Sequence, residues 1–425
     1  MQTTATMKAF EFLEKAATVI GIIAFCGTLL PALITGDRGA ADQDSPGVML
    51  IFVGLYVVII GLICARPQLM AQIPTVSPLM TLLTLAVFAS AAWSIFPDVT
   101  MRRAVALLFT TAFGVYMGLR YSFVDNLKLL VTGTAITMLL SYASIVAMPD
   151  IGLDSEQHVG AWKGIFWQKN VTGRIMVTLI TCLLWLEWLG EGRRWVNRGL
   201  LALAFLLLVM CRSGTSLITA IVVVGVLLSA NLARTNIRVF MLTMAALGLG
   251  TLAAIFAGPM IFEGVLALLG RDAGLTGRDL IWEHVLAMLN DHVLLGFGFG
   301  AFWYGPYAPG SYFVMNWGIN SAHNGWLELM LDLGVLGLVL VGLLMGQIVV
   351  QGFFTMRYSP RPMEPAWALA IACTLLTISI SESVFLGRHS LTWVVLVIAA
   401  IRLVLHRRAL YASAPVRPVL AMPPG

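Results

Sequence analysis

Several arginines lie where chemistry on a phosphate is expected. Among them, Arg212 stands on a four-residue turn between two apolar stretches. An arginine at the end of a membrane helix costs up to about 2.5 to 3.5 kcal/mol on insertion scales and usually marks a substrate path. Each planar guanidinium can hold two phosphate oxygens in parallel hydrogen bonds. These residues predict a diphosphate site. For Arg38, Arg102 and Arg103, snorkelling to lipid headgroups is an equal alternative.

One histidine is placed differently from the other five. His323 opens the sequence HNGWLELM, where the long polar segment meets an apolar stretch. A neutral imidazole there would accept a proton from a sugar hydroxyl, because its usual pKa of about 6.5 is near working pH. The alternative is a histidine at a helix start that only satisfies nearby backbone groups.

Metal chemistry is a weaker interpretation of the polar residues. Asp272, Asp279 and Glu283 offer carboxylates to a divalent ion, but three acids at a helix start more often complement the helix dipole. The five cysteines are scattered singly without CxxC spacing, which argues against a zinc site and a disulfide framework. We expect no metal, no cofactor and no nucleic-acid partner.

The composition decides what kind of elements must position these residues. Of 425 residues, 59% are hydrophobic and 11% are charged, and the mean hydropathy is +0.90. A soluble domain carries about 25% charged residues. The sequence therefore excludes a soluble globular protein and predicts an all-α, polytopic membrane protein.

Twelve stretches are long and apolar enough to cross a bilayer as helices. The predicted spans are Ala17 to Ile34, Gly47 to Ala65, Pro78 to Phe96, Val105 to Leu119, Leu127 to Ala147, Val171 to Leu189, Gly199 to Cys211, Ser216 to Ala230, Val239 to Gly258, Gly334 to Phe354, Pro365 to Phe385 and Leu391 to Val404. The seventh and eighth spans are short, so one long helix across Arg212 is an alternative. The first span is expected to be a retained signal anchor.

The distribution of lysine and arginine sets the orientation. With both termini inside, 16 of the 26 basic residues fall on the cytoplasmic side, giving a net charge of +10 inside and −5 outside. The ten basic residues that remain outside are Arg38, Arg102, Arg103, Lys163, Lys169, Arg174, Arg212, Arg271, Arg278 and Arg388. They lie on the face where the candidate site is expected.

The chain is expected to have four parts. Residues 1–258 carry spans one to nine, residues 259–333 form a periplasmic loop with the catalytic region, residues 334–404 carry spans ten to twelve, and residues 405–425 are a cytoplasmic, disordered tail. Within the loop, Asp279 to His292 predicts a short helix at the membrane interface. The GFGFG run from Gly296 to Gly300 lacks the strand and helix of a dinucleotide motif, so it is interpreted as a tight turn.

Several motifs, in order along the chain, resemble the O-antigen ligase and exopolysaccharide polymerase superfamily. They are WSIFPDVTMRRA (Trp93 to Ala104), AWKGIFWQKNVTGR (Ala161 to Arg174), CRSGTS (Cys211 to Ser216), LTGRDLIW (Leu275 to Trp282), LLGFGFGAFW (Leu294 to Trp303) and HNGWLELMLDLGVLG (His323 to Gly337). The resemblance covers most of the chain from Trp93 to Gly337.

The resemblance implies a bacterial inner-membrane glycosyltransferase of the GT-C-like class with a periplasmic active site. Such enzymes pass a glycan from undecaprenyl diphosphate to a hydroxyl, with inversion and without an essential metal. By matching motifs, His323 carries over as the catalytic histidine, Arg212 and Arg278 as diphosphate ligands, and Lys169 and Arg174 as lesser contributors. Gln168 departs from the pattern, since many relatives have a histidine there.

The expected chemistry suits these residues. A lipid diphosphate is already activated, so its cleavage needs mainly stabilisation of charge on the leaving phosphate, which fixed arginines supply. An O-antigen ligase would use lipid A-core as acceptor, whereas a polymerase would use another lipid-linked repeat unit. The single large loop favours a ligase, and a polymerase fits nearly as well. A twelve-helix secondary transporter is the remote alternative, and it would predict two related halves.

Overall fold

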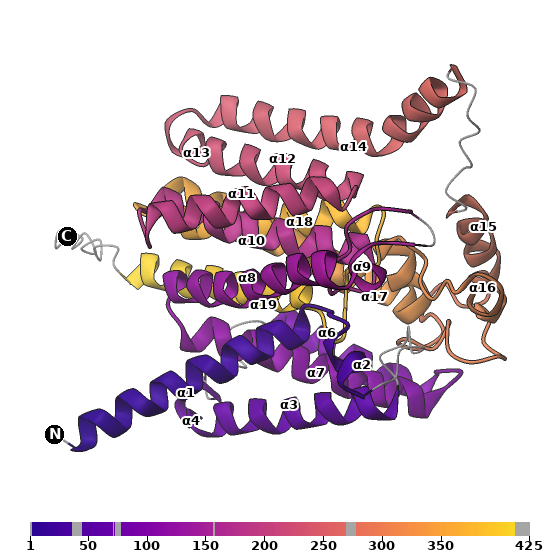
Figure 1. Ribbon diagram of the computed structural model, residues 1–425, viewed down its shortest axis with the longest axis horizontal. Coiled ribbons are helices and arrows are strands. Elements are labelled where there is room, and N and C mark those ends of the chain that lie inside the picture. Colours follow the sequence, from indigo (N-terminus) through magenta and orange to yellow (C-terminus); the bar gives the residue numbers. More distant parts are fainter. Residues whose placement is uncertain are drawn as a thin grey trace, which may run out of the picture.

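A computed structural model describes residues 2–35, 45–70, 72, 78–155, 158–268 and 278–412. The named elements in this part of the chain are helices, and the longer ones lie side by side in one bundle (Figure 1). The longer helices are α1 (Gln2–Phe25), α3 (Pro46–Cys64), α6 (Pro78–Ala89), α7 (Pro97–Arg120), α8 (Phe123–Ala147), α10 (Lys169–Leu189), α11 (Arg194–Met210), α12 (Gly214–Ser229), α14 (Ile237–Leu268), α17 (Gly325–Tyr358), α18 (Met363–Ser379) and α19 (Leu391–Ala412). The all-α prediction is confirmed for the described residues.

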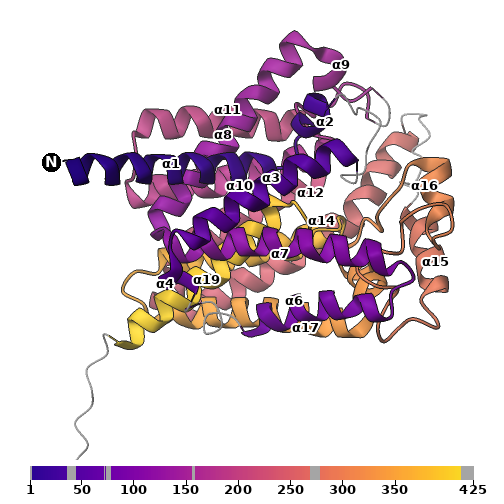
Figure 2. The same ribbon diagram turned by 90° about the horizontal axis from the view of Figure 1, so that it is seen from below.

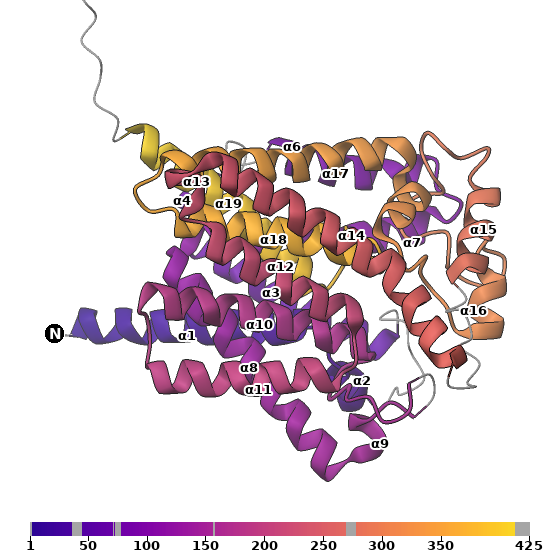
Figure 3. The same cartoon turned by 90° about the horizontal axis from the view of Figure 1, so that it is seen from above.

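Short helices lie mainly at the two ends of the bundle. They are α2 (Leu30–Thr35), α4 (Pro67–Met70), the 3-10 turn η1 (Ser90–Ala92), α9 (Pro149–Gly152), α13 (Leu232–Thr235), α15 (Arg278–Met288) and α16 (Ser311–Trp317). The start of α1 and the end of α19 lie at one end, and α15 and α16 lie at the other (Figures 1, 2 and 3). We refer to the end that carries α15 and α16 as the loop end.

Four of the described helices are long and apolar enough to cross a membrane, namely α3, α8, α10 and α17. Shorter apolar helices cover Pro78–Ala92, Gly214–Ser229, Ile237–Ala253 and Met363–Ser379. Large apolar side chains point outward from the bundle, including Leu50 on α3 at 73% exposure and Leu242 on α14 at 70%. Such surfaces fit hydrocarbon rather than water. The total of twelve spans stays a prediction.

The first helix does not follow its predicted bounds. It begins at Gln2 and ends at Phe25, whereas the predicted span ran from Ala17 to Ile34. Gly27 has a φ of +71°, a conformation that glycine adopts without a steric penalty. Leu29 then donates a backbone hydrogen bond of 2.7 Å to Ile165. Hydropathy misses this break because the residues around it are apolar apart from Thr28.

The bounds of other helices also differ from the predicted spans. α7 begins at Pro97, so Arg102 and Arg103 belong to its first turns rather than to a loop. α14 continues beyond Gly258 to Leu268, and α19 extends past Val404 to Ala412. Residues 413–425, which complete the predicted tail, lie outside the described part of the chain.

The seventh and eighth spans are two separate helices. α11 ends at Met210 and α12 begins at Gly214, with Arg212 between them at a φ of +52°. A continuous α-helix would require a negative φ at this position. The alternative of one long helix is therefore wrong.

Small residues bring the central helices close together. A Cβ atom added to Gly114 of α7 would lie 2.8 Å from the Val397 side chain of α19, and one added to Gly118 would lie 2.8 Å from Ile401. Gly133 of α8 approaches Ile22 of α1 in the same way, at 2.5 Å. Close backbone approach at small residues is the usual means by which membrane helices associate.

A buried carboxylate ties together the end of the bundle opposite the loop end. Glu14 accepts hydrogen bonds from Arg120 at 2.8 and 2.9 Å, from Arg66 at 2.9 and 3.2 Å and from Tyr116 at 2.7 Å. The hydrogen bond to Glu14 raises the pKa of Arg66, which follows α3. Removing one partner of such a buried pair is strongly destabilising. This cluster therefore has a structural role.

Candidate active site

The helix that follows His323 is broken close to the site. α17 has a non-helical residue at Gly334, with φ 61° and ψ −151°. Val335 donates to the Val293 carbonyl at 2.8 Å, and Leu336 donates to the Leu294 carbonyl at 3.3 Å. The preceding loop thereby satisfies backbone groups that the break would leave unpaired, as a break at membrane depth requires.

The GFGFG run is a tight turn, as predicted. It forms hydrogen bonds both to α17 near the break and to α7. Gly296, Gly298 and Gly300 all have positive φ. The Gly300 N–H donates to Asp332 of α17 at 2.7 Å, and Arg103 of α7 donates to the Gly300 carbonyl. A Cβ at Gly296 would lie 2.6 Å from a backbone oxygen of α17. Glycine is thus required for close packing here.

The predicted interfacial helix is present as α15, and one of its faces packs against protein. Ile281, Val285 and Leu289 are buried together with Phe302 and Phe313 of the loop. Leu286 remains exposed. Contact of that face with a membrane interface stays a prediction.

His323 is held in an unusual backbone conformation directly before α17. Its φ is +47°, in the left-handed region that non-glycine residues rarely adopt. Its side chain is 23% exposed, and Nδ1 makes no hydrogen bond to any described residue. Asn324 caps the helix by accepting from Trp326 at 3.0 Å and Leu327 at 3.1 Å. Asn324 therefore satisfies the backbone groups that the alternative interpretation assigned to His323.

Glu382, in the turn between α18 and α19, connects three other site residues. Its Oε2 lies 3.9 Å from His323 Nδ1, and its Oε1 accepts a hydrogen bond of 2.6 Å from Asn170. Arg174 of α10 is close enough to interact electrostatically with the same carboxylate. Glu382 is buried, with 8% of the residue exposed. A buried carboxylate with cationic and amide partners can orient an imidazole and stabilise its protonated form.

A second carboxylate fixes the backbone beside His323. Glu328 accepts from the Ala322 N–H at 2.7 Å, from Trp303 Nε1 at 2.9 Å and from Ser383 Oγ at 3.0 Å. These bonds join the loop, the first turn of α17 and the turn that carries Glu382. Because the loop, α17 and this turn are distant from one another in the sequence, the position of His323 depends on the folded chain and not on local sequence.

Arg212 lies on the exposed turn between α11 and α12. Lys169 Nζ, at the start of α10, donates to the Arg212 carbonyl at 3.2 Å, and Arg212 itself contacts the Val159 carbonyl at 3.5 Å. The adjacent Cys211 is buried. Two basic side chains therefore lie at this turn, Arg212 and the Lys169 that is hydrogen-bonded to its backbone.

The structure therefore brings most of the predicted residues to the loop end. His323 Nδ1 lies 3.9 Å from Glu382, whose carboxylate also interacts electrostatically with Arg174, and Lys169 donates to the Arg212 carbonyl. Arg278 is the first residue of α15, and its side chain lies outside the described part of the structure. The predictions for Arg38, Arg271, Asp272 and the side chain of Asp279 also fall outside it.

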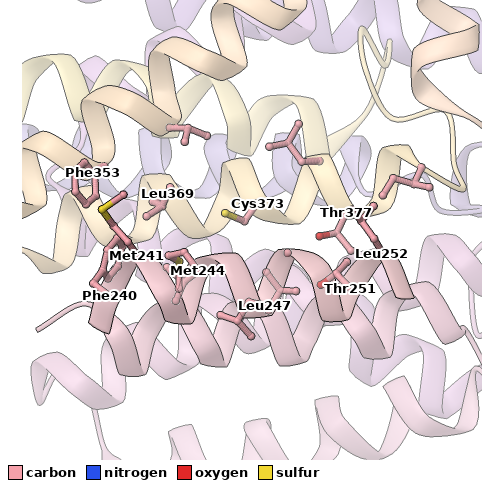
Figure 4. Close-up of a pocket in the computed structure, with 16 residues that line it drawn as sticks. Phe240, Met241, Met244, Leu247, Thr251, Leu252, Phe353, Leu369, Cys373 and Thr377 are labelled. Atoms are coloured by element: carbon pink, nitrogen blue, oxygen red, sulfur yellow. The ribbon is translucent and has the colours of Figure 1, made fainter. Parts of the chain in front are cut away.

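An apolar groove runs from this site along the bundle. It has a volume of about 500 Å³ and lies between α14 and the helices α12, α17 and α18. Figure 4 shows Met244, Leu247 and Leu252 of α14 facing Leu369 and Thr377 of α18. The lining ends at Ile380, next to Ser381, whose hydroxyl is 2.7 Å from the Thr215 hydroxyl. The groove thus reaches the turn that carries Glu382.

Known proteins resemble the part of the chain that carries this geometry. The family model described as O-Antigen ligase matches residues 199–342, which include Arg212, Arg278 and His323. The resemblance to the O-antigen ligase superfamily is confirmed. The chain is also similar to the exopolysaccharide production protein ExoQ of Rhizobium meliloti (strain 1021), with 27% identity over 177 residues. That match covers 39% of this chain and about 40% of the relative's length.

Sequence reasoning missed Glu382, Asn170 and Glu328. The signal for Glu382 was present, because it lies inside the predicted span from Pro365 to Phe385, and an ionisable residue within an apolar span is a functional candidate by default. Its partner Asn170 follows Lys169 inside the motif that runs from Ala161 to Arg174. Spacing gives no hint that these residues meet, since 212 positions separate Asn170 from Glu382.

Proposed function

We propose that this protein is a membrane glycosyltransferase that moves a glycan from a lipid diphosphate to a hydroxyl acceptor at the loop end of the bundle. The observation that carries the proposal is the buried Glu382 carboxylate, which faces His323 Nδ1 at 3.9 Å and interacts with Arg174. A base oriented by a carboxylate, next to basic groups that suit a diphosphate, is the set of groups that this reaction needs.

In the proposed reaction, His323 takes the proton of the acceptor hydroxyl. The acceptor oxygen forms a bond to the anomeric carbon while the bond from that carbon to the diphosphate oxygen breaks. The bonding electron pair leaves with the diphosphate, whose charge Arg212, Arg174, Lys169 and Arg278 stabilise. Glu382 stabilises the imidazolium that forms. The reaction inverts the anomeric centre, because base and leaving group act from opposite sides.

The apolar groove supports a lipid-linked donor. Its lining is formed almost entirely by apolar side chains, and it ends beside Ser381 and Glu382. A hydrocarbon chain in the groove would therefore place its diphosphate next to the basic residues. We propose undecaprenyl diphosphate as the carrier and the periplasmic face of the bacterial inner membrane as the location, with both termini in the cytoplasm.

The acceptor distinguishes two candidate functions. The description of the family model favours an O-antigen ligase, which would use lipid A-core. The similarity to an exopolysaccharide production protein favours a polymerase, which would use a second lipid-linked repeat unit. Either acceptor fits the same base and the same leaving group.

The proposal is tested with the purified full chain in lipid nanodiscs, given undecaprenyl-diphosphate-linked glycan and each acceptor in turn. We expect glycan on one acceptor and an equal amount of released undecaprenyl diphosphate. His323→Ala should lower turnover by about 10² to 10⁴, the usual contribution of a general base, whereas His158→Ala on an exposed segment should not. Transfer by folded His323→Ala at the wild-type rate would remove His323 from the mechanism.

A further inference from the structure

A second cavity lies at the edge of the bundle formed by α3 and α7. Its volume is about 280 Å³. One wall comes from α3, including Phe52, Val53 and Tyr56, and the other comes from the first turns of α7. The turn before α19 closes it with Arg388 and His389. In Figure 1, α3 and α14 lie at opposite edges of the bundle, so this cavity is separate from the apolar groove along α14.

The cavity is basic. Arg102, Arg103 and Arg388 line it, and none of the lining residues in the described part of the chain carries a carboxylate. Arg102 is exposed, whereas Arg103 is buried and lies over the ring of Tyr304 at 5.4 Å. Three guanidinium groups around one space suit an anion with several oxygens, above all a phosphate.

The polar wall of the cavity is rigid. The His389 ring stacks on Phe52 with a centroid distance of 3.5 Å and an interplanar angle of 4°. Its Nε2 is 2.5 Å from the Tyr56 hydroxyl, and its backbone N–H donates to Thr110 at 3.0 Å. Leu386 and His389 both have positive φ, so Arg388 stands in a turn whose shape the fold imposes. Preorganised groups of this kind lower the entropy cost of binding.

The cavity adjoins a surface suited to lipid. Val53, which lines it, is 50% exposed, and its neighbours Leu50 and Val57 on α3 are also exposed. α3 has the highest mean hydropathy of the four candidate spans, at 2.8. An anionic ligand that enters from this side would carry hydrocarbon chains along α3. A phospholipid meets both conditions, because its headgroup carries the negative charge and its hydrocarbon chains would lie against the exposed apolar side chains of α3.

We infer that this cavity binds the phosphate group of a second membrane lipid, distinct from the donor. Arg103, which lines the cavity, donates to the Gly300 carbonyl, and the Gly300 N–H donates to Asp332 at the break of α17 at 2.7 Å, so the cavity is connected to the turn that holds the GFGFG run. The ligand class is a lipid phosphate. It is supplied either by an anionic phospholipid or by a lipid-linked acceptor glycan, and only the acceptor role rests on the proposed function.

Binding of dioleoyl phosphatidic acid to the purified full chain, counted by native mass spectrometry, tests the inference. The double variant Arg102→Gln with Arg388→Gln should bind at least tenfold more weakly than wild type. The matched double variant Arg193→Gln with Arg194→Gln, which removes two exposed arginines at the opposite end, should bind normally. A photo-crosslinking amino acid at Val53 should capture the lipid in wild type and lose it in the first variant.

Three results would overturn the inference. They are unchanged binding by the Arg102 and Arg388 double variant, equal binding of dioleoylglycerol, which lacks phosphate, and full competition by equimolar inorganic phosphate. Competition by lipid A-core, which is an acceptor and not a donor, identifies the acceptor as the source, whereas competition by phosphatidylglycerol alone identifies a phospholipid. His323→Ala should bind phosphatidic acid normally. A loss of glycan transfer can therefore be distinguished from a loss of lipid binding in this cavity.

Discussion

Asn170 donates a hydrogen bond of 2.6 Å to Glu382, across 212 positions of the chain. This bond joins the start of α10 to the turn between α18 and α19. It holds the carboxylate where His323 lies on one side and Arg174 interacts with it. The orientation of the proposed base is therefore set by helices that are distant in sequence.

Glu382→Gln tests the charge of this carboxylate. The amide keeps an oxygen that can accept the Asn170 hydrogen bond, so the fold should survive while the charge facing His323 is lost. We expect turnover to fall by roughly 10- to 100-fold, as when a group that orients a catalytic side chain is removed. Steady-state transfer and thermal unfolding are measured together. Glu187→Gln, at the opposite end of α10, is the control, and equal turnover in both variants would contradict the role of Glu382.

Arg212→Lys and Arg278→Lys should both lose most of the transfer activity. Lysine keeps the positive charge but cannot hold two phosphate oxygens with one planar group. Protein level should stay normal because Arg212 is exposed and Arg278 begins a helix. Arg198→Lys, on an exposed surface pair with Glu187, serves as the matched control. If both test variants transfer glycan like wild type, the diphosphate is bound elsewhere.

Gly248→Phe should impair use of a long-chain donor by filling the apolar groove. An added Cβ at Gly248 meets nothing within 4 Å, and the residue lines the groove. We expect KM for the undecaprenyl-linked donor to rise about tenfold, equivalent to about 1.4 kcal/mol, with little change for a farnesyl-linked donor.

Gly250→Phe is the control for the groove. Gly250 lies on the same helix, also has open space around its added Cβ and is absent from the groove lining. Its KM should match wild type for both donors. An equal rise of KM in the two variants would mean that the groove does not hold the donor chain.

A cysteine at Ser311, the first residue of α16, should react with a membrane-impermeant thiol reagent in intact spheroplasts. The predicted excess of positive charge on the inside, from the distribution of lysine and arginine, predicts that the loop end faces outside. The native Cys64, exposed near the opposite end at the last residue of α3, should react only after permeabilisation. The reverse pattern of labelling would invert the topology and move the proposed site to the cytoplasm.

The sequence determined the class of fold and the residue types of the site. Its apolar stretches fix helices, because every backbone group in a bilayer must be paired within the chain. The motif order indicated the superfamily, and residue type with position selected His323 and Arg212. These features are local, since each depends on hydropathy or on a short run of neighbours.

Only the tertiary structure decided which groups meet. Glu382 reaches His323 because α18 ends beside the start of α17, and Arg388 reaches the cavity with Arg102 because α19 packs against α7. The breaks at Gly27 and Gly334 are equally invisible to hydropathy, since both lie in predominantly apolar stretches and are set by contacts with distant segments. Helix packing angles and loop contacts depend on side chains far apart in the chain, which no local pattern encodes.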